Sequence, residues 1–188
     1  MERKDQERKE LEFKGEYPSF DLEGRLTPSR EADDFFGDEG LAGIDASPRL
    51  RGIVLHDILA KVKLPAELEG AVADAVRDGR LDADGGHKAL SLLRSRLAAH
   101  PDWFPETETA AKVLNEQSLF NPDGEEYRPD RVILQGRQAV IVDYKFGQEK
   151  EDYRYQLQRY ARLWHELGYD VVGAYVWYVE NDKTVKAI

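Results

Sequence analysis

The stretch of sequence that decides the fold is residues 128–145, RPDRVILQGRQAVIVDYK. It contains two apolar runs separated by a short turn at residues 135–137. Two apolar runs joined by so short a turn are typical of an antiparallel β-hairpin. The pattern therefore predicts one strand over residues 127–134 and a second over residues 138–145.

This turn also predicts which residues of the hairpin lie opposite one another. Residues whose numbers add up to about 272 or 273 should pair, so Asp130 is expected across from residue 142 or 143. Side chains two positions apart on a strand share a face, so Asp143 and Lys145 point to the same side of the sheet. The sequence therefore predicts two carboxylates at one end of the hairpin with a lysine beside them.

This arrangement indicates a particular chemistry. Neighbouring carboxylates repel each other unless a proton or a cation lies between them. Hard divalent cations such as Mg²⁺ and Mn²⁺ prefer oxygen ligands, and a nearby lysine can orient or help deprotonate a water and stabilise developing negative charge. Asp130, Asp143 and Lys145 are thus candidates for metal-dependent phosphodiester hydrolysis. A surface hairpin with scattered ion pairs is the simpler explanation for any of them alone.

Two further polar residues stand in apolar segments. Glu116 lies within residues 112–120, which are predicted to be a strand, and strands seldom carry a carboxylate there without a role. His56 lies on a helix predicted over residues 48–62, whose apolar residues recur at helical spacing. A half-exposed strand and a core histidine are the alternatives.

A long helix is predicted directly after the hairpin, over residues 151–167, and Gly168 ends it. Gln156 and Tyr160 are four residues apart and share one face, and Tyr153 precedes them by one turn. This face can pack beside the carboxylates. A tyrosine-rich helix that only covers a sheet is the alternative.

The rest of the chain predicts an α/β domain over residues 47–188, with a mixed central sheet flanked by helices. Ser47 is the expected N-cap of the first helix. Residues 1–46 combine dense charge with scattered glycine and proline and are expected to form a loose N-terminal arm. Two further helices and two further strands are predicted at residues 65–78, 86–100, 171–179 and 184–188.

Composition excludes several classes of protein. The chain has 188 residues, 41% of them hydrophobic and 34% charged, which fits one domain with a tail. It has no cysteine, so disulfides, cysteine-bound zinc, iron–sulfur clusters and a cysteine nucleophile are excluded. No apolar run approaches the roughly 20 residues that cross a bilayer, and the charged start is unlike a signal peptide. No membrane association and a cytoplasmic location are therefore expected.

The net charge of −10 argues by itself against nucleic-acid binding, because phosphates repel an acidic surface. The charge is unevenly distributed, however. Residues 1–50 hold 8 basic and 14 acidic side chains, whereas residues 51–188 hold 19 and 23. Carboxylates that gather around a divalent metal are also largely neutralised once it is bound.

The combined motifs resemble the PD-(D/E)XK nuclease superfamily, and within it the RecB-like (RecB/AddA-like) nuclease domains at the C-terminal ends of UvrD/Rep-type helicases. The resemblance covers residues 48–188 and implies a restriction-endonuclease-like α/β core with an N-terminal helical segment. The Asp-Tyr-Lys motif alone is weak, but five motifs occur in the right order: RGIVLH at 51–56, Glu116, RPDR at 128–131, DYK at 143–145 and QLQRY at 156–160.

The resemblance implies a role for each matched residue. Lys145 would position the attacking water, and Glu116 would be a further acidic residue of the active site. The metal ligands would be His56, Asp130, Asp143 and the backbone carbonyl of Tyr144. The residues that would support the site and contact DNA are Gln156, Tyr160, Arg131 and Tyr153.

The resemblance also implies a function. The domain would be a Mg²⁺-dependent deoxyribonuclease, an exonuclease for which Mn²⁺ can substitute, working with a superfamily I helicase motor of the same chain or complex in double-strand break repair and recombination. Residues 1–46 would be the remains of a linker from the helicase body. Some relatives carry a cysteine-bound iron–sulfur cluster, and this chain would belong to the cluster-free branch. It has no P-loop sequence with which to hydrolyse ATP itself.

Two other classes of function remain as alternatives. One is a catalytically inert nuclease-like module that binds DNA ends or another protein. Inert relatives usually lose a carboxylate or the lysine, whereas every motif position is filled here. The other is a small-molecule metal hydrolase, which would need a deep apolar pocket.

Overall fold

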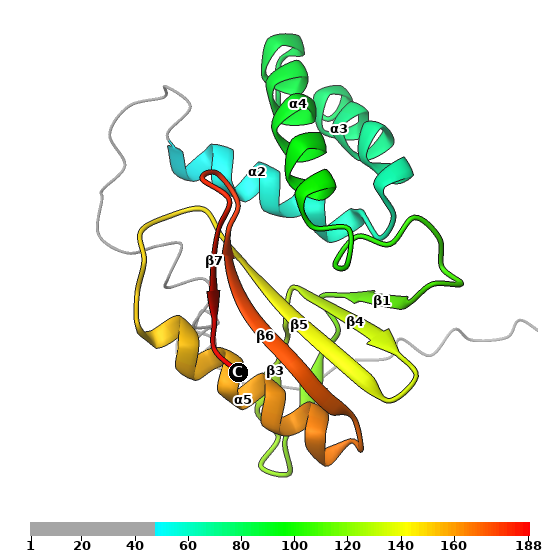
Figure 1. Cartoon of the computed structure of the whole chain (residues 1–188). Helices are drawn as coiled ribbons and strands as arrows, with labels where there is room; N and C mark the ends of the chain where they lie inside the picture. The colour runs from blue at the N-terminus through cyan, green and yellow to red at the C-terminus, as the bar shows by residue number, and fades with distance from the viewer. Residues whose placement is uncertain (1–47) are drawn as a thin grey trace, which may run out of the picture. The chain divides into compact units, whose positions relative to one another are not determined.

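The computed structural model of this chain describes residues 48–188 (Figure 1). The predicted arm over residues 1–46 and the predicted N-cap Ser47 lie outside the described residues. Across residues 48–188, no helix has the combination of length and apolar character needed to cross a membrane. The helical elements are α2 (Pro48–Lys61), the 3₁₀ helix η2 (Pro65–Glu67), α3 (Leu68–Arg77), α4 (Ala83–Ala99) and α5 (Asp152–Glu166).

The strands form a mixed central sheet, as the sequence predicts. Its order is β1-β4-β5-β6-β7, and β2 and β3 form a separate two-stranded pair. Every neighbouring pair in the large sheet is antiparallel except β5 and β6, which are parallel and joined through α5. The strands are β1 (Lys112–Asn115), β2 (Leu119–Phe120), β3 (Glu126–Tyr127), β4 (Arg131–Gln135), β5 (Gln138–Lys145), β6 (Asp170–Tyr178) and β7 (Lys183–Lys186).

The hairpin of β4 and β5 has the predicted register. Arg131 pairs with Val142 at one end, and Gln135 pairs with Gln138 next to the turn. Gly136 has a φ of 60°, a left-handed conformation that glycine adopts without steric cost. The predicted arrangement of this hairpin is therefore confirmed.

Two predicted strands are wrong because each is interrupted. The strand expected over residues 112–120 ends at Asn115, whose side-chain amide donates to the carbonyls of Ala60 and Val62 at the end of α2. The strand expected over residues 127–134 is divided between β3 and β4, with Pro129 between them. Proline has no N–H for the ladder, so the pairing cannot run through it.

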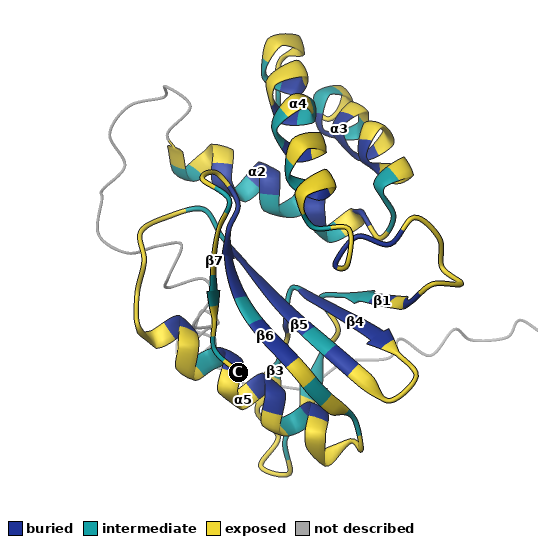
Figure 2. Ribbon diagram, viewed as in Figure 1, coloured by how far each residue is buried: buried dark blue, intermediate teal, exposed yellow. Residues whose placement is uncertain are grey.

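The alternation of side chains along the sheet produces two hydrophobic cores, one on each face (Figures 1 and 2). On one face, Ile133, Val142 and Tyr144 pack with buried residues of α2, α3 and α4. On the other face, Val132 and Ile141 pack with the buried face of α5. The face of the sheet to which a side chain of β4 or β5 points therefore decides whether it packs against α2, α3 and α4 or against α5.

Helix α2 approaches the end of β5 closely at Gly52. A Cβ atom added at Gly52 would lie 2.9 Å from the Cβ of Phe146, the residue that follows β5. We expect Gly52→Ala to lower the free energy of unfolding by about 1–3 kcal/mol, because the added methyl group overpacks this contact. The change is measured by urea denaturation.

Gly70 in α3 is the matched control, since a Cβ added there meets nothing within 4 Å. Gly70→Ala is expected to stabilise the protein by about 0.5–1 kcal/mol, because alanine favours a helix interior over glycine. Equal effects of the two substitutions would show that the approach of α2 to Phe146 does not constrain the fold.

Candidate active site

The site is built at the end of the β4–β5 hairpin that lies furthest from its turn. Asp130 immediately precedes β4, and Asp143 lies near the end of β5. A carboxylate oxygen of Asp130 accepts a hydrogen bond from the backbone N–H of Tyr144 at 2.5 Å. The predicted meeting of Asp130 with residues near Asp143 at this end of the hairpin is therefore confirmed.

Lys145 lies on the same face as Asp143, as alternation requires. Its ammonium nitrogen is 2.9 Å from a carboxylate oxygen of Asp143 and 4.5 Å from the centroid of the Tyr153 ring. Burial acts to lower the pKa of Lys145, but the carboxylates of Asp143 and Asp130 raise it more, so the pKa lies above its ordinary value. The lysine is thus held as a cation at the centre of the site.

His56 reaches the same carboxylates from α2. Its Nε2 lies 3.2 Å from Asp130, and its Nδ1 lies 3.8 Å from Glu116. Its ring contacts Tyr144 edge-on, with the centroids 6.1 Å apart. Burial acts to lower the pKa of His56, but Asp130, Glu116 and Asp143 together raise it to about 9. In return, although burial acts to raise it, the pKa of Asp130 is lowered by His56 and Lys145.

Glu116 lies at the site but not within a strand, which corrects the prediction of a strand there. It follows β1 and has a φ of 47°, a conformation that is uncommon outside glycine. Its backbone N–H donates to the carbonyl of Asp130 at 3.0 Å, which ties the two acidic residues together. The end of β1 at Asn115 turns the chain so that Glu116 faces His56.

Residues of α5 contact the site and hold parts of it in position. The side-chain amide of Gln156 donates to the hydroxyl of Tyr160 at 2.8 Å, and that hydroxyl donates to the carbonyl of Arg128 at 3.4 Å. Tyr153 packs under the ammonium group of Lys145. Tyr153 and Tyr160 are buried, so they can position the site but cannot present their rings to DNA.

The prediction that Arg131 contacts DNA is wrong, because this side chain is completely buried. Its guanidinium donates to the carbonyls of Trp103, Val62 and Lys63 at 2.7–2.9 Å and stacks on the ring of Phe104 at 4.0 Å. Arg131 begins β4 directly after Asp130, and neighbouring side chains along a strand point to opposite faces. The alternation of faces along the strand can be read from the sequence, and it indicates that Arg131 points away from Asp130 and into the core.

Two further residues belong to the site, although the sequence analysis gives neither of them a role. Arg128 lies 3.9 Å from the carboxylate of Glu116, and Asn115 holds the end of α2. Arg128 precedes Asp130 by two positions, the same spacing as between Asp143 and Lys145. Residues at this spacing share a face of a strand, so the sequence could have indicated that Arg128 lies on the side of Asp130. Nothing local to Asn115 predicts its contact with α2.

The side chains present fit a hard divalent cation by their chemistry, since they offer carboxylate oxygens and an imidazole nitrogen. The charges of His56 and Lys145 neutralise these carboxylates here, and in residues 48–188 no three histidine, aspartate or glutamate side chains stand together as a metal-binding group. A bound metal would therefore replace the ion pairs of His56 and would require the neutral imidazole. The carbonyl of Tyr144 as a ligand stays a prediction.

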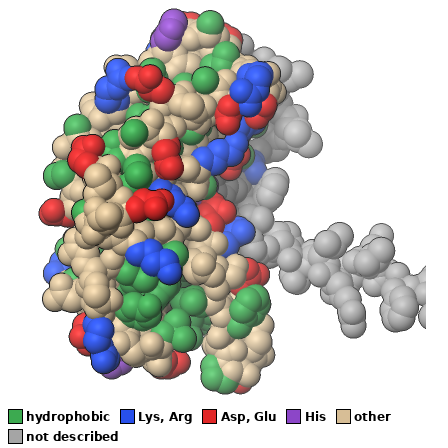
Figure 3. Space-filling view, turned by 90° about the vertical axis from the view of Figure 1, so that its right-hand side faces the viewer, with side chains coloured by type: hydrophobic (Ala, Val, Ile, Leu, Met, Phe, Trp, Pro, Cys, Tyr) green, Lys and Arg blue, Asp and Glu red, His purple; other side chains and the backbone are tan. Residues whose placement is uncertain are grey.

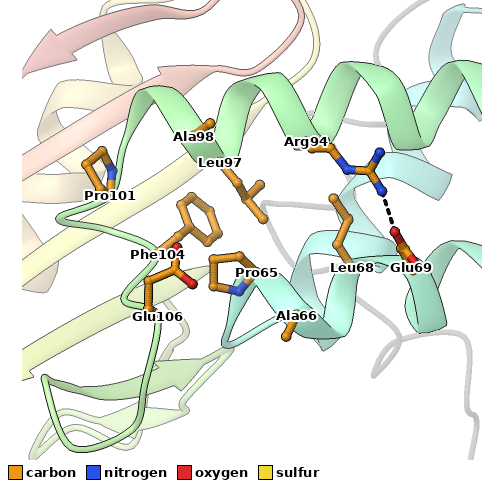
Figure 4. Close-up of a pocket in the computed structure, with 10 residues that line it drawn as sticks. All are labelled: Pro65, Ala66, Leu68, Glu69, Arg94, Leu97, Ala98, Pro101, Phe104 and Glu106. Atoms are coloured by element: carbon orange, nitrogen blue, oxygen red, sulfur yellow. Dashed lines mark hydrogen bonds and ion pairs between the residues drawn. The ribbon is translucent and has the colours of Figure 1, made fainter.

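A pocket lies elsewhere in the structure, between α3, α4 and the segment after α4 (Figure 4). Its lining is largely apolar, and the ion pair of Arg94 with Glu69 closes one side. None of the candidate site residues lines it. This pocket therefore gives no support to a small-molecule hydrolase built on the carboxylates.

The face of the molecule shown in Figure 3 carries interspersed positive and negative side chains. Exposed ion pairs within α3 and α4 follow the same pattern, as with Arg77 and Asp74 or Lys88 and Asp84. Such a surface has no strong field of one sign and does not by itself attract a polyanion.

No protein-family model matches the chain, and no curated protein shows significant sequence similarity to it.

Proposed function

We propose that residues 48–188 form a PD-(D/E)XK nuclease domain of the RecB-like branch, which hydrolyses phosphodiester bonds of DNA in a Mg²⁺-dependent reaction. In this proposal the domain is an exonuclease that works with a superfamily I helicase motor in double-strand break repair and recombination. Mn²⁺ can replace Mg²⁺.

One observation carries the proposal. Asp130, Asp143 and Lys145 gather at one end of the hairpin, and His56 and Glu116 approach the same point from α2 and from the end of β1. These residues come from three separate parts of the chain, and each belongs to a motif of the sequence pattern. Scattered surface ion pairs do not explain the burial of Asp143, whose side chain is only 2% exposed.

The metal would be held by Asp130, Asp143, His56 and the carbonyl of Tyr144, with Glu116 acting directly or through water. When bound, Mg²⁺ supplies a Lewis acid for a phosphate oxygen and lowers the pKa of a bound water. The protein's own part is to hold these oxygen and nitrogen donors in place. The hydrogen bond from the backbone of Tyr144 to Asp130 restricts that carboxylate to one orientation.

Lys145 would orient the attacking water and stabilise the negative charge that develops on the phosphate. Its position is suited to this role because Asp143 and the Tyr153 ring restrain the ammonium group from two sides. A preorganised cation in a largely buried site stabilises developing charge more than it would in water.

The test of this function is cleavage of labelled single-stranded and duplex DNA in Mg²⁺, in Mn²⁺ and in EDTA. We expect cleavage with either metal and none in EDTA. Absence of cleavage under all three conditions, together with metal-independent DNA binding, would favour the inert binding module.

Metal binding has its own prediction, which does not depend on activity. Millimolar Mg²⁺ or Mn²⁺ should raise the melting temperature of the wild type, because a ligand at a hundred times its Kd stabilises the native state by about 2.7 kcal/mol. Asp143→Asn should abolish this increase, since it removes a charged ligand while preserving shape.

Asp84→Asn is the matched control, because Asp84 lies exposed on α4 in an ion pair with Lys88. It should leave the metal-induced increase unchanged. A wild-type melting temperature that does not respond to millimolar metal would contradict the metal site.

A further inference from the structure

Arg128 stands at the solvent edge of the candidate active site. Its guanidinium lies 3.9 Å from one carboxylate oxygen of Glu116, and the other oxygen of Glu116 lies 3.8 Å from His56. Glu116 therefore links Arg128 to the buried part of the site. The side chain of Arg128 is 45% exposed, whereas that of Lys145 is 15% exposed and Arg131 is fully buried.

A nucleic-acid strand would be repelled at this site, because its phosphates would face the three carboxylates of Asp130, Asp143 and Glu116. The charges of Lys145 and His56 are engaged with those carboxylates inside the site. An exposed guanidinium at the edge can offset the repulsion. Its planar array of donors also matches two oxygens of one phosphate, which a lysine cannot do.

The structure holds the backbone of Arg128 in a defined place. Tyr160, oriented by Gln156, donates to the carbonyl of Arg128, and Pro129 restricts the backbone of Arg128, the residue before it. Glu116 is equally fixed, since it keeps a left-handed backbone conformation and bonds to the backbone of Asp130. A left-handed backbone at a residue other than glycine costs free energy and persists only where surrounding contacts hold it. Such residues are concentrated at functional sites.

From these contacts we infer that Arg128 is a substrate-binding residue that contacts a backbone phosphate of the DNA strand, and that Glu116 orients its guanidinium before the strand arrives. This inference rests on the proposed nuclease function. It assigns the phosphate contact to Arg128 instead of Arg131, which is buried in the core. Arg128 belongs to the RPDR motif, but the resemblance gave it no role of its own.

The experiment measures binding of a labelled single-stranded oligodeoxythymidine in Mg²⁺ over a series of salt concentrations, with Lys145→Ala as the parent so that cleavage is slow compared with the binding measurement. Arg128→Ala is expected to weaken binding about tenfold and to reduce the slope of log affinity against log salt by about 0.7, the value for one lost phosphate contact on a single strand. Arg128→Lys should keep the slope and lose part of the affinity.

Two controls separate this role from a structural one. Arg77→Ala removes an exposed arginine of α3 and should match the parent. Glu116→Gln should keep the salt slope, because the cation that meets the phosphate is still present. The inference is overturned if the parent does not bind, if Arg128→Ala keeps the parental slope, or if Glu116→Gln reproduces its loss of slope.

Cleavage by the chain that retains Lys145 decides the proposed function separately. Binding with an Arg128-dependent slope but without metal-dependent cleavage would overturn the nuclease and support the phosphate contact. Metal-dependent cleavage with kcat and KM unaffected by Arg128→Ala would overturn the inference alone.

Discussion

Replacing Lys145 with alanine is expected to lower the rate of metal-dependent DNA cleavage by about a hundredfold or more. The reason is that the ammonium group orients the attacking water and stabilises charge that develops only in the transition state. DNA affinity should fall only slightly, as for one lost phosphate contact. The measurement is cleavage of a labelled single strand at saturating metal.

Because the substitution leaves the buried carboxylate of Asp143 without its ion pair to lysine, folding must be measured alongside activity. The melting temperature should still rise with metal, since lysine is not a ligand. Lys88→Ala is the control, because Lys88 lies exposed on α4. Equal cleavage rates in wild type and Lys145→Ala would remove Lys145 from the mechanism, whereas an effect on affinity alone would favour the binding module.

Replacing Arg131 with methionine is expected to lower the free energy of unfolding by about 3–5 kcal/mol. Methionine has a similar length but donates no hydrogen bond, so the hydrogen bonds to the carbonyls of Trp103, Val62 and Lys63 are lost. The buried carbonyl of Trp103 is left without its donor, at a cost of about 1–3 kcal/mol, whereas the amide of Asn115 still donates to Val62. The stacking of the guanidinium on Phe104 is lost as well. Removal of a buried charge offsets part of this loss. Urea denaturation followed by circular dichroism measures the change.

Arg77→Met is the matched control, since Arg77 is exposed on α3 and should change stability by less than about 0.5 kcal/mol. Arg131→Lys should also destabilise the protein, because a single ammonium group cannot reach three carbonyls arranged around a planar fork. A loss below about 1 kcal/mol in Arg131→Met, with an unchanged dependence on urea, would contradict a structural role for Arg131.

Lys145 and Arg131, two cationic side chains of the same hairpin, are therefore expected to have different roles. Lys145 and Arg131 both lie on paired strands, and Arg131 is fully buried whereas the side chain of Lys145 is 15% exposed. Lys145 shares the face of Asp143 and meets carboxylates, whereas Arg131 lies on the opposite face and meets backbone carbonyls. One residue is therefore expected to affect turnover and the other to affect folding.

Local features of the sequence determined the central part of the fold. The turn around Gly136, the alternation along β5 and the helical period of α5 each act within a few residues, so their effect can be predicted without knowledge of the rest of the chain. The same local rules predicted that Asp130 meets the end of β5 and that Asp143 and Lys145 share a face. Pro129 was an equally local signal, and the prediction of an unbroken strand through it was wrong.

Only the tertiary structure decided how the outer parts of the site meet this hairpin. The contacts of His56 with Asp130 and Glu116 require α2 to pack on one face of the sheet, where Gly52 permits a close approach to Phe146. The turn at Glu116 and the enclosure of Arg131 likewise depend on where the carbonyls at the end of α2 come to lie. Periodicity specifies which face of a segment is buried, but the partner of that face is set by packing between segments distant in the chain.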